Sequence, residues 1–550
     1  MYLSKLMIKN IIIMLKKISL LLLVVLTITI TSCNEDFLET KPTDAISAAD
    51  ALNSPENMRL VINGLHKIMY AQNGLIPGGS NTRSGMQYFL PMYDVISGDL
   101  IHSARGNGWM RAELQWNTHT LETSATVSQL WYQRYQIIAS CNSIINKVEE
   151  DGLTKDANLN DILGQAHAYR AWAYHSLVST YGKGYLIGNP ISDPGVPLLF
   201  ATEAPYTSEP RSTVQVIYDQ VYADIDIAID YFQNAAPSDN KSNLDLNTAY
   251  GIKARVALSA GDWSLAAENA IKARDGYPLI DEAGWNSGFN TTDLSEVIWG
   301  ARVISTETTF FTSYFYYMSP TFQGSQNRGN PKLISKKVYD NTPATDYRAD
   351  LYLPTAPNTN GAAANGEGGF GNDPNYTDLA TFQAARTEIE NKWGVTSRHN
   401  QHPYMHVKFR NKNPGTIDPD DVTFMRASEM YLIEAEAEAM IGNVTAAQDA
   451  LKSLGEKRDS AYDVTIYDTV EKLMNHIKWQ RRIELYAEGF GYHDHIRWDE
   501  GIDLTDSGAS IELYQDGFTQ AKPSVNDDWI FKIPQREIDS NPNLTQADQN

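Results

Sequence analysis

Apolar residues recur at helical spacing over long stretches of the chain, which predicts a mainly α-helical protein. Aromatic and aliphatic positions follow one helix face from Trp131 to Val148, and a second helix is expected from Leu163 to Tyr181. A third is expected from Val214 to Phe232, and it leads into another that begins near Tyr250. We expect these segments to pack as antiparallel helix pairs, because each has an apolar face to bury.

Two stretches carry the spacing of a tetratricopeptide repeat, in which two antiparallel helices are joined by a tight turn. The first stretch has its characteristic residues at Tyr250, Ala254, Gly261, Asp262, Trp263, Ala266, Ala273 and Pro278. The second has them at Tyr431, Ala435, Gly442, Asn443, Ala447, Leu451 and Leu454. Small residues let the helices approach closely, glycine permits the turn, and Pro278 is expected to end the second helix of the first stretch. The helix pairs described in the preceding paragraph resemble degenerate copies of the same repeat. Together with the two stretches above, they predict a scaffold of four hairpins, which occupies three ranges of the chain at about 127–182, 213–278 and 424–490.

Two regions between the predicted helices have few long amphipathic patterns and many turn-forming residues. They cover about 74–116 and 279–423, and the second contains a glycine-rich run from Pro354 to Tyr376. Binding residues are often carried by loops on a rigid scaffold, so we expect the ligand-binding region here.

The beginning of the chain has the order of a bacterial lipoprotein signal. Four lysines precede an apolar stretch from Ile18 to Ile30, and two small residues follow it directly before Cys33. The apolar stretch is shorter than the roughly 20 residues that span a bilayer as a helix. We therefore expect removal of residues 1–32, acylation of the Cys33 thiol, and a single domain over 33–550. The alternative is an ordinary secretory signal in which this cysteine occurs by chance.

Composition and charge narrow the classes of partner. The 550 residues carry a formal net charge of -22, so the surface repels nucleic acid and anionic lipid headgroups, and only the lipid would attach the protein to a membrane. If Cys33 is acylated, Cys141 has no thiol with which to form an intramolecular disulfide. The core alone must then stabilise the fold, which is feasible at this chain length.

No pattern in the sequence asks for catalysis, a metal or a cofactor. The motifs of serine hydrolases, phosphate-binding loops and zinc peptidases are absent. Aspartate and glutamate number 67, so carboxylate pairs suited to glycoside hydrolysis occur throughout and distinguish nothing. His493 and His495 would lie on one side of an extended segment, but no further ligand cluster accompanies them. The residues themselves therefore give no reason to expect an enzyme.

Motifs at both ends of the chain resemble those of the SusD/RagB family of Bacteroidetes lipoproteins. After Cys33 come Asp36-Phe37-Leu38 and Pro42, and the acidic residues here also resemble the signal that directs such proteins to the outer face of the outer membrane. The C-terminal matches are Arg481-Arg482-Ile483-Glu484-Leu485, Glu488-Gly489, Asp494-His495-Ile496-Arg497-Trp498, Ile533-Pro534, Glu537-Ile538, Asn541-Pro542-Asn543-Leu544 and Gln546. Two positions depart from the family pattern, since Gly491 replaces a commonly basic residue and His495 an apolar one.

The C-terminal motif places charged residues on one helix face. Arg481, Glu484 and Glu488 follow one another at positions i, i+3 and i+7. Either they form a paired network of arginine and carboxylate groups inside the scaffold, or they form a solvated charged face. The spacing leaves both interpretations open.

The resemblance implies a mainly α-helical SusD-like fold, with tetratricopeptide-type hairpins and a loop-rich binding region. It implies a lipid-anchored protein on the cell surface of the outer membrane. Such a protein binds an oligosaccharide or polysaccharide and delivers it to a SusC-like TonB-dependent transporter. The alternatives are a surface lipoprotein that captures peptide or another nutrient, as a RagB-like protein would, and a lipid-anchored hydrolase.

Sugars present flat apolar C–H faces and a rim of hydroxyls, so a capture site needs exposed aromatic planes beside polar groups. The predicted glycan-binding residues are Arg105, Trp109, Tyr314, Tyr316, Tyr317 and Trp393. Trp109 follows a glycine in a Gly-Asn-Gly-Trp sequence, which disfavours burial on a regular element. The run 310–317 is the densest aromatic segment, and its alternative interpretation is a β-strand with alternate side chains in the core.

Overall fold

The computed structural model describes residues 7, 9, 14–17, 52–72, 82–104, 106, 108–200, 208–306, 308–323, 332–360, 369–373, 375–514 and 519–550. The chain divides into two compact units, Met1–Asn57 and Met58–Asn550. Cys33 and most of the predicted signal lie outside the described residues, so the lipidation and the domain boundaries stay predictions. Across the part of the chain that is described, no helix combines the length and the apolar character of a membrane span.

The chain is mainly helical, as the sequence pattern predicts. The α-helices are α2 (Pro55–Ile68), α3 (Met86–Ser97), α4 (Arg111–Leu114), α5 (Ala125–Glu150), α6 (Ala157–Tyr181), α7 (Val214–Gln233), α8 (Leu246–Ala260), α9 (Trp263–Ala273), α10 (Glu282–Trp285), α11 (Tyr314–Met318), α13 (Lys336–Asp340), α14 (Leu379–Trp393), α15 (Ala427–Ile441), α16 (Val444–Arg458), α17 (Val470–Glu484), α18 (Gly491–Trp498) and α19 (Gln535–Ser540). Short 3₁₀ helices are η3 (Tyr347–Leu351), η4 (Phe370–Asn372), η5 (Val464–Ile466), η6 (Ile511–Leu513), η8 (Asp527–Trp529) and η9 (Gln546–Asp548).

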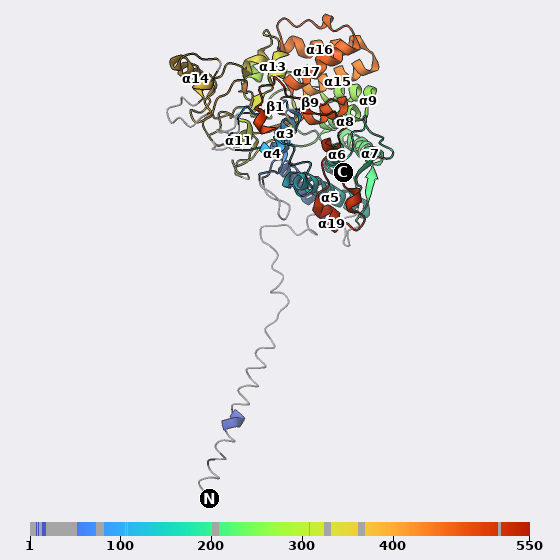
Figure 1. Cartoon of the computed structure of the whole chain (residues 1–550). Helices are drawn as coiled ribbons and strands as arrows, with labels where there is room; N and C mark the ends of the chain where they lie inside the picture. Colours follow the sequence, from blue (N-terminus) through green and yellow to red (C-terminus); the bar gives the residue numbers. More distant parts are fainter. Residues whose placement is uncertain are drawn as a thin grey trace. The chain divides into compact units, whose positions relative to one another are not determined.

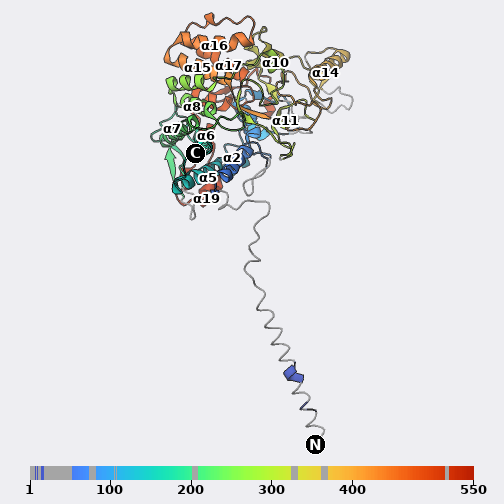
Figure 2. The same cartoon turned by 180° about the vertical axis from the view of Figure 1, so that it is seen from behind.

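The long helices pack in a continuous series. Each of α5 to α9 contacts the next, α9 contacts α15, and α15 contacts both α16 and α17. In both views of the second unit, α7, α8 and α16 lie on one side, and α11 and α14 lie on the other (Figures 1 and 2). The scaffold helices and the loop-rich region thus occupy different sides of this unit.

The two predicted hairpins contain helix pairs at the expected places. Gly261 ends α8 and Gly442 ends α15, each in the left-handed backbone region that favours glycine. Ala254 and Ala266 are fully buried, consistent with close approach of α8 and α9. The helix α9 ends at Ala273 rather than at the predicted Pro278, because the chain already turns at the positive φ of Gly276. The assignment of these pairs as tetratricopeptide repeats stays a prediction.

Short antiparallel strands join segments that are distant in the sequence. They are β1 (Leu100–Ile101), β2 (Pro194–Pro197), β3 (Arg211–Thr213), β4 (Val297–Ala301), β5 (Leu333–Ile334), β6 (Tyr352–Leu353), β7 (Met405–His406), β8 (Val422–Arg426), β9 (Ile502–Asp503) and β10 (Thr519–Gln520). One sheet has the order β1-β5-β7-β6, with Leu100 opposite Ile334 and Leu333 opposite Met405. The other pairs are β4 with β8, β2 with β3, and β9 with β10. The four-stranded sheet brings the two predicted loop-rich regions together, since β1 comes from the first and the other strands from the second.

Both loop-rich regions contain a helix that the periodicity did not predict. The helix α3 is buried on nearly all sides and contains Pro91, so it has no polar face to create an amphipathic pattern. The helix α14 buries only Phe382 and is otherwise largely polar. Neither helix has the alternation of apolar and polar faces on which the prediction depended.

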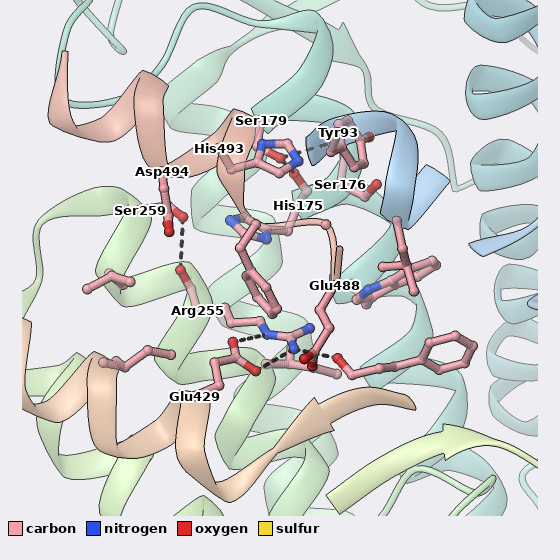
Figure 3. A pocket seen from close by; sticks show the side chains of 18 of the residues that line it. Tyr93, His175, Ser176, Ser179, Arg255, Ser259, Glu429, Glu488, His493 and Asp494 are labelled. Carbon is pink, nitrogen blue, oxygen red and sulfur yellow. Dashed lines mark hydrogen bonds and ion pairs between the residues drawn. The ribbon is translucent and has the colours of Figure 1, made fainter. Parts of the chain in front are cut away.

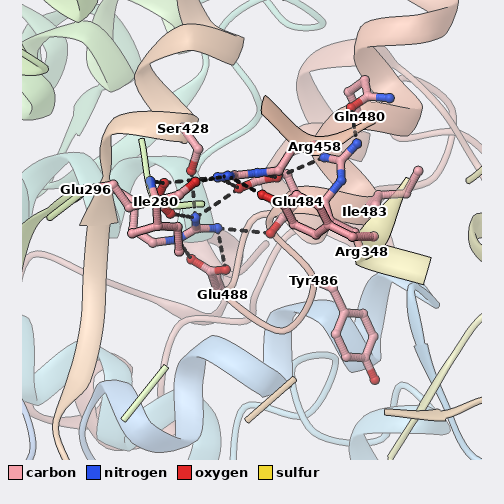
Figure 4. Close-up of polar contacts among 12 residues, drawn as sticks. Ile280, Glu296, Arg348, Ser428, Arg458, Gln480, Ile483, Glu484, Tyr486 and Glu488 are labelled. Atoms are coloured by element: carbon pink, nitrogen blue, oxygen red, sulfur yellow. Dashed lines mark hydrogen bonds and ion pairs between the residues drawn. The ribbon is translucent and has the colours of Figure 1, made fainter. Parts of the chain in front are cut away.

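A buried ion network fastens the C-terminal helices to the loop-rich region (Figure 4). It contains equal numbers of cations and carboxylates, namely Arg348, Lys408, Arg426 and Arg458 with Glu296, Asp346, Glu484 and Glu488. Glu484 lies at its centre, with oxygens 2.8 Å from Arg348, 3.0 Å from Arg426 and 3.1 Å from Arg458. Burial opposes ionisation of Glu484, but the three guanidinium groups outweigh it and hold the pKa of that carboxyl well below its usual range.

The network decides between the two interpretations of the charged face. Glu484 and Glu488 are buried and paired, so they are part of an internal network and not of a solvated surface. Arg481 also points inward, but its partner is Asp494 at 2.7 Å, outside this network. The paired-network interpretation is therefore confirmed, with Arg481 in a separate ion pair.

The two departures from the family pattern lie on α18. Gly491 donates its backbone N–H to Asp94 at 2.8 Å, and a Cβ atom at this position would overlap Ser97. Glycine therefore allows α18 to approach α3. His495 stacks on Trp529, with ring centroids 5.7 Å apart. The extended conformation expected for the segment that contains His495 is wrong, because the segment is helical.

Candidate functional site

The helix α11 brings the predicted aromatic run into contact with Trp109. The centroid of the Trp109 ring lies 6.3 Å from that of Phe311, 5.9 Å from that of Tyr316 and 5.7 Å from that of Tyr317. The ring planes meet at steep angles, which is the edge-to-face arrangement that aromatic pairs prefer. We call these four residues the aromatic cluster. Two segments predicted separately from the sequence thus form one feature.

Exposure divides the aromatic cluster into a surface layer and a buried base. Phe311 is 38% exposed and Trp109 is half-buried, whereas Tyr316 and Tyr317 are at most 2% exposed. Phe310, next to the cluster, is 42% exposed. A ligand that approaches this surface meets Trp109 and the two phenylalanines, and the tyrosines hold them from below.

The alternative interpretation of the run 310–317 as a β-strand is wrong, because Tyr314–Met318 form α11. Ser313 accepts a hydrogen bond from the backbone N–H of Tyr316 and begins α11, so the side chains do not alternate between two faces. Thr312 has a positive φ of 62°, which turns the chain between the exposed phenylalanines and the helix. Tyr314, Tyr316 and Tyr317 are all buried as a result, and the direct-contact role predicted for them is corrected to a supporting one.

Polar groups fix the loop that carries the phenylalanines. Gln72 donates to the carbonyl of Thr309 at 2.9 Å, and its own side-chain oxygen accepts from Thr308 and from the backbone N–H of Thr309. The Tyr317 hydroxyl donates to the carbonyl of Thr82 at 2.5 Å. These contacts bind the loop to the part of the chain that precedes α3.

Arg83 supplies a charged group beside the aromatic cluster. It follows Thr82, to which Tyr317 is bonded, and its side chain is 34% exposed. Its Nε lies 3.4 Å from a carboxylate oxygen of Glu113, which is buried and also accepts from Tyr88. A half-exposed guanidinium next to aromatic planes can donate to ligand hydroxyls.

The ion network holds α11 in place from the opposite side. The Tyr314 hydroxyl donates to the carbonyl of Ala487 at 3.0 Å. Ala487 lies in the turn between Glu484 and Glu488, and Lys408 donates to the carbonyls of Glu484 and Tyr486 in that turn. The C-terminal motif therefore positions the aromatic run, although the two are about 170 residues apart in the sequence.

Two predicted glycan-binding residues, Trp393 and Arg105, remain to be placed. Trp393 is half-buried at the end of α14, with the Arg410 guanidinium 5.0 Å and the Lys392 ammonium 4.8 Å from its ring centroid. Within the described ranges it makes no ring contact with the aromatic cluster. Arg105 lies outside the described residues.

Sequence reasoning missed Phe311, Arg83 and Gln72. Phe311 was inside the aromatic run, but only the turn at Thr312 shows that it faces outward. Arg83 and Gln72 carry no local signal, because their role depends on contacts with Glu113 and with the loop at Thr309.

The arrangement suits binding. The surface layer is apolar and planar, and a guanidinium lies beside its base. In the described part of the chain, no three His, Cys, Asp or Glu side chains gather in a way that could hold a metal ion.

Two family models match the chain. One, described as the SusD family, matches residues 277–549, and one described as starch-binding associating with outer membrane matches residues 36–258. Among curated relatives, SusD-like protein P25 of Formosa agariphila is 22% identical over 543 residues, which cover 94% of this chain and 95% of the relative. SusD-like protein P38 of the same organism is 22% identical over 526 residues, 89% of this chain and 93% of the relative.

Solved structures have the same fold. A SusD-like carbohydrate binding protein from Bacteroides vulgatus has a TM-score of 0.71 at 21% identity, covering 90% of this chain and 98% of that one. A SusD superfamily protein from Bacteroides thetaiotaomicron has a TM-score of 0.70 at 20% identity, covering 90% and 99%. The surface glycan-binding protein A from Bacteroides fluxus has a TM-score of 0.63 at 16% identity, covering 90% and 99%. The fold of this chain is that of these proteins.

Proposed function

Because the chain belongs to the SusD family, whose members are non-catalytic binding proteins, we propose that it captures an oligosaccharide or polysaccharide at the cell surface. It then delivers this ligand to a SusC-like TonB-dependent transporter for uptake. The lipid on Cys33 holds it at the outer membrane, facing outward. The family description of outer-membrane association and the expected signal before Cys33 support this location.

The observation that carries the proposal is the exposed layer of the aromatic cluster. Soluble proteins rarely leave neighbouring large aromatic side chains in water unless they serve a binding surface. Trp109 and Phe311 offer apolar faces that match the C–H face of a pyranose ring, and Arg83 offers donors for its hydroxyls. Among the solved relatives, one is described as carbohydrate binding and another as glycan-binding.

The test is a titration of glycans against a soluble version of the protein that lacks residues 1–33. Isothermal titration calorimetry with a panel of polysaccharide classes should give saturable binding for one class, without release of reducing ends. If each partner buries about 40 Å² of apolar surface at Trp109, the stack contributes about 2 kcal/mol, so Trp109→Ala should weaken binding about 30-fold.

A matched control separates the aromatic cluster from other exposed aromatic residues. Phe311→Ala should weaken binding by several-fold, whereas Phe200→Ala should leave it unchanged, because Phe200 is similarly exposed but lies outside the cluster. Unchanged affinity in both Trp109→Ala and Phe311→Ala would remove this site. Saturable binding of peptides, with none of any glycan, would support the alternative of peptide capture and overturn the carbohydrate proposal.

A further inference from the structure

A cavity of about 130 Å³ lies inside the helical scaffold (Figure 3). Its walls come from α3, α5, α6, α8, α15, α17 and α18 and from the strands β4 and β8, and none of the aromatic cluster lines it. A dry cavity of about 150 Å³ can hold a molecule of the size of benzene, so this one has room for a small ion or molecule. Its lining is unusual because it contains several arginines.

All but one of the arginines that line the cavity have a carboxylate partner. Arg255 makes two contacts with Glu429, at 2.6 and 2.7 Å. Arg481 makes two with Asp494, at 2.7 and 3.0 Å. Arg497 shares Asp494 and also pairs with Glu436.

Arg134 is the exception. Its partners are the Ser176 hydroxyl at 3.0 Å, the Met86 sulfur at 3.3 Å and the Gln133 amide oxygen, and its guanidinium stacks over the Trp172 ring at 4.3 Å. No carboxylate of the described chain lies within ion-pair distance of it. The side chain is 1% exposed, so water does not compensate the charge from outside.

The charge on Arg134 persists at neutral pH. Burial lowers the pKa of the guanidinium to about 10, with small opposing effects of Tyr93 and Tyr181, and it stays protonated. Burial also lowers the pKa of His175 to about 3 and that of His493 to about 4, so both imidazoles are neutral. The cavity therefore carries one buried positive charge that no carboxylate among the described residues pairs with, and such a charge is costly unless something pairs with it.

Buried hydrogen-bonding atoms at the cavity also lack partners. Nη1 of Arg481 and Nε2 of His175 are buried and have no partner in the described chain. The Ser176 hydroxyl accepts from Arg134, and its own proton is available for another group. Unsatisfied buried groups are uncommon in native proteins, and here they gather at the same cavity as the unpaired guanidinium.

A second, smaller hollow of about 20 Å³ adjoins the cavity. It shares the lining residues Ser179, Ser259, His493 and Arg497 with it. Its other wall includes Lys183 and Leu186, and Leu186 is 40% exposed. This hollow lies between α6, α8 and α18, and Lys183 is among its lining residues.

We propose that this cavity binds one small oxyanion, with the Arg134 guanidinium as its counter-charge and with Arg481, His175 and Ser176 as further donors. Both an inorganic oxyanion and the carboxylate of a small organic acid have this chemistry. The site is separate from the aromatic cluster, so the proposal does not depend on glycan binding.

The test is isothermal titration calorimetry of the full-length protein, purified from membranes in detergent. Sodium phosphate, sodium sulfate and sodium acetate are titrated separately at an ionic strength held constant with sodium chloride. Saturable binding of one ion per chain is the expected result. Binding of phosphate or sulfate alone assigns the site to inorganic oxyanions, and binding of acetate alone assigns it to carboxylates.

Variants locate the binding. Arg134→Gln should weaken it at least tenfold, since hydrogen bonds to charged groups contribute about 1.5–3 kcal/mol. Ser259→Leu fills space at the wall that the two hollows share and should also weaken binding, whereas Lys272→Gln on the surface should not. Circular dichroism verifies that each variant is folded.

Two results overturn the proposal. The first is the absence of saturable binding for all three anions by the folded wild-type protein. The second is binding of wild-type strength in folded Arg134→Gln and Ser259→Leu, because the ion would then occupy another place.

Discussion

Glu484→Gln is expected to destabilise the protein strongly, although the glutamine side chain has almost the same size and shape as the glutamate that it replaces. The substitution removes one negative charge from a network in which cations and carboxylates are equal in number, and it leaves a buried excess of positive charge. Breaking a buried pair by removal of one partner costs about 3–5 kcal/mol. Glu484 contacts three arginines, so we expect the upper part of this range.

The magnitude can be converted to a melting temperature. Unfolding entropy is about 2.1 cal/mol/K per residue, which for roughly 490 residues gives about 1 kcal/mol/K. A loss of about 5 kcal/mol therefore lowers the Tm by about 5 °C in differential scanning calorimetry at pH 7.5. The surface variant Glu268→Gln, which removes one partner of an exposed pair with Lys272, should shift the Tm by less than about 1 °C.

A double variant tests the electrostatic reason. Removing Arg426 as well restores equal numbers of charges, and each remaining carboxylate keeps a partner, namely Arg348 with Asp346, Arg458 with Glu296 and Lys408 with Glu488. Glu484→Gln with Arg426→Met should therefore recover at least half of the lost stability. A Glu484→Gln single variant as stable as the wild type, or a double variant less stable than the single one, would refute this reasoning.

Three further predictions concern acid, one buried aspartate and one glycine. The pKa values of Glu484, Glu488 and Asp494 are depressed in the folded protein. Denaturant titrations should therefore show that the stability is maintained above about pH 5 and is lost as the pH falls through the depressed pKa values of these carboxyl groups in the folded state. Burial, with repulsion from Asp494, raises the pKa of Asp99 to about 6 in spite of Arg482, so its effect has the opposite sign. Relative to the wild type, Asp99→Asn should gain about 2 kcal/mol between pH 4 and pH 7 in urea unfolding, and a constant difference would contradict this. Gly491→Ala, whose Cβ would overlap Ser97 and lie 2.9 Å from Asp94, should cost about 1–3 kcal/mol by thermal unfolding, whereas Gly64→Ala, which has open space in α2, should not destabilise.

The sequence was informative where physical periodicity or a local turn determines structure. The helix pairs at α8–α9 and α15–α16 could be located because Gly261 and Gly442 mark their turns and buried alanines mark their interfaces. The helix α3 could not be located from the sequence, because a helix that is buried on nearly all sides has no amphipathic periodicity. The boundary of α9 was misplaced because the glycine before Pro278 turns the chain first.

The site was predictable in part. Trp109 and the aromatic run were both identified, but their contact depends on α11, whose capping by Ser313 was not recognised. That helix reverses the expectation for the tyrosines, since it buries them and leaves Phe311 exposed. The partners of Glu484 lie up to 136 positions away in the sequence, so spacing alone could not tell a network from a solvated face.

A crystal structure of the protein with a bound oligosaccharide tests the central claim most directly. We expect a sugar ring stacked against Trp109 or Phe311, with a hydroxyl within hydrogen-bond distance of Arg83. A glycan bound on the scaffold side of the molecule, with the aromatic cluster unoccupied at saturating ligand, would contradict the account.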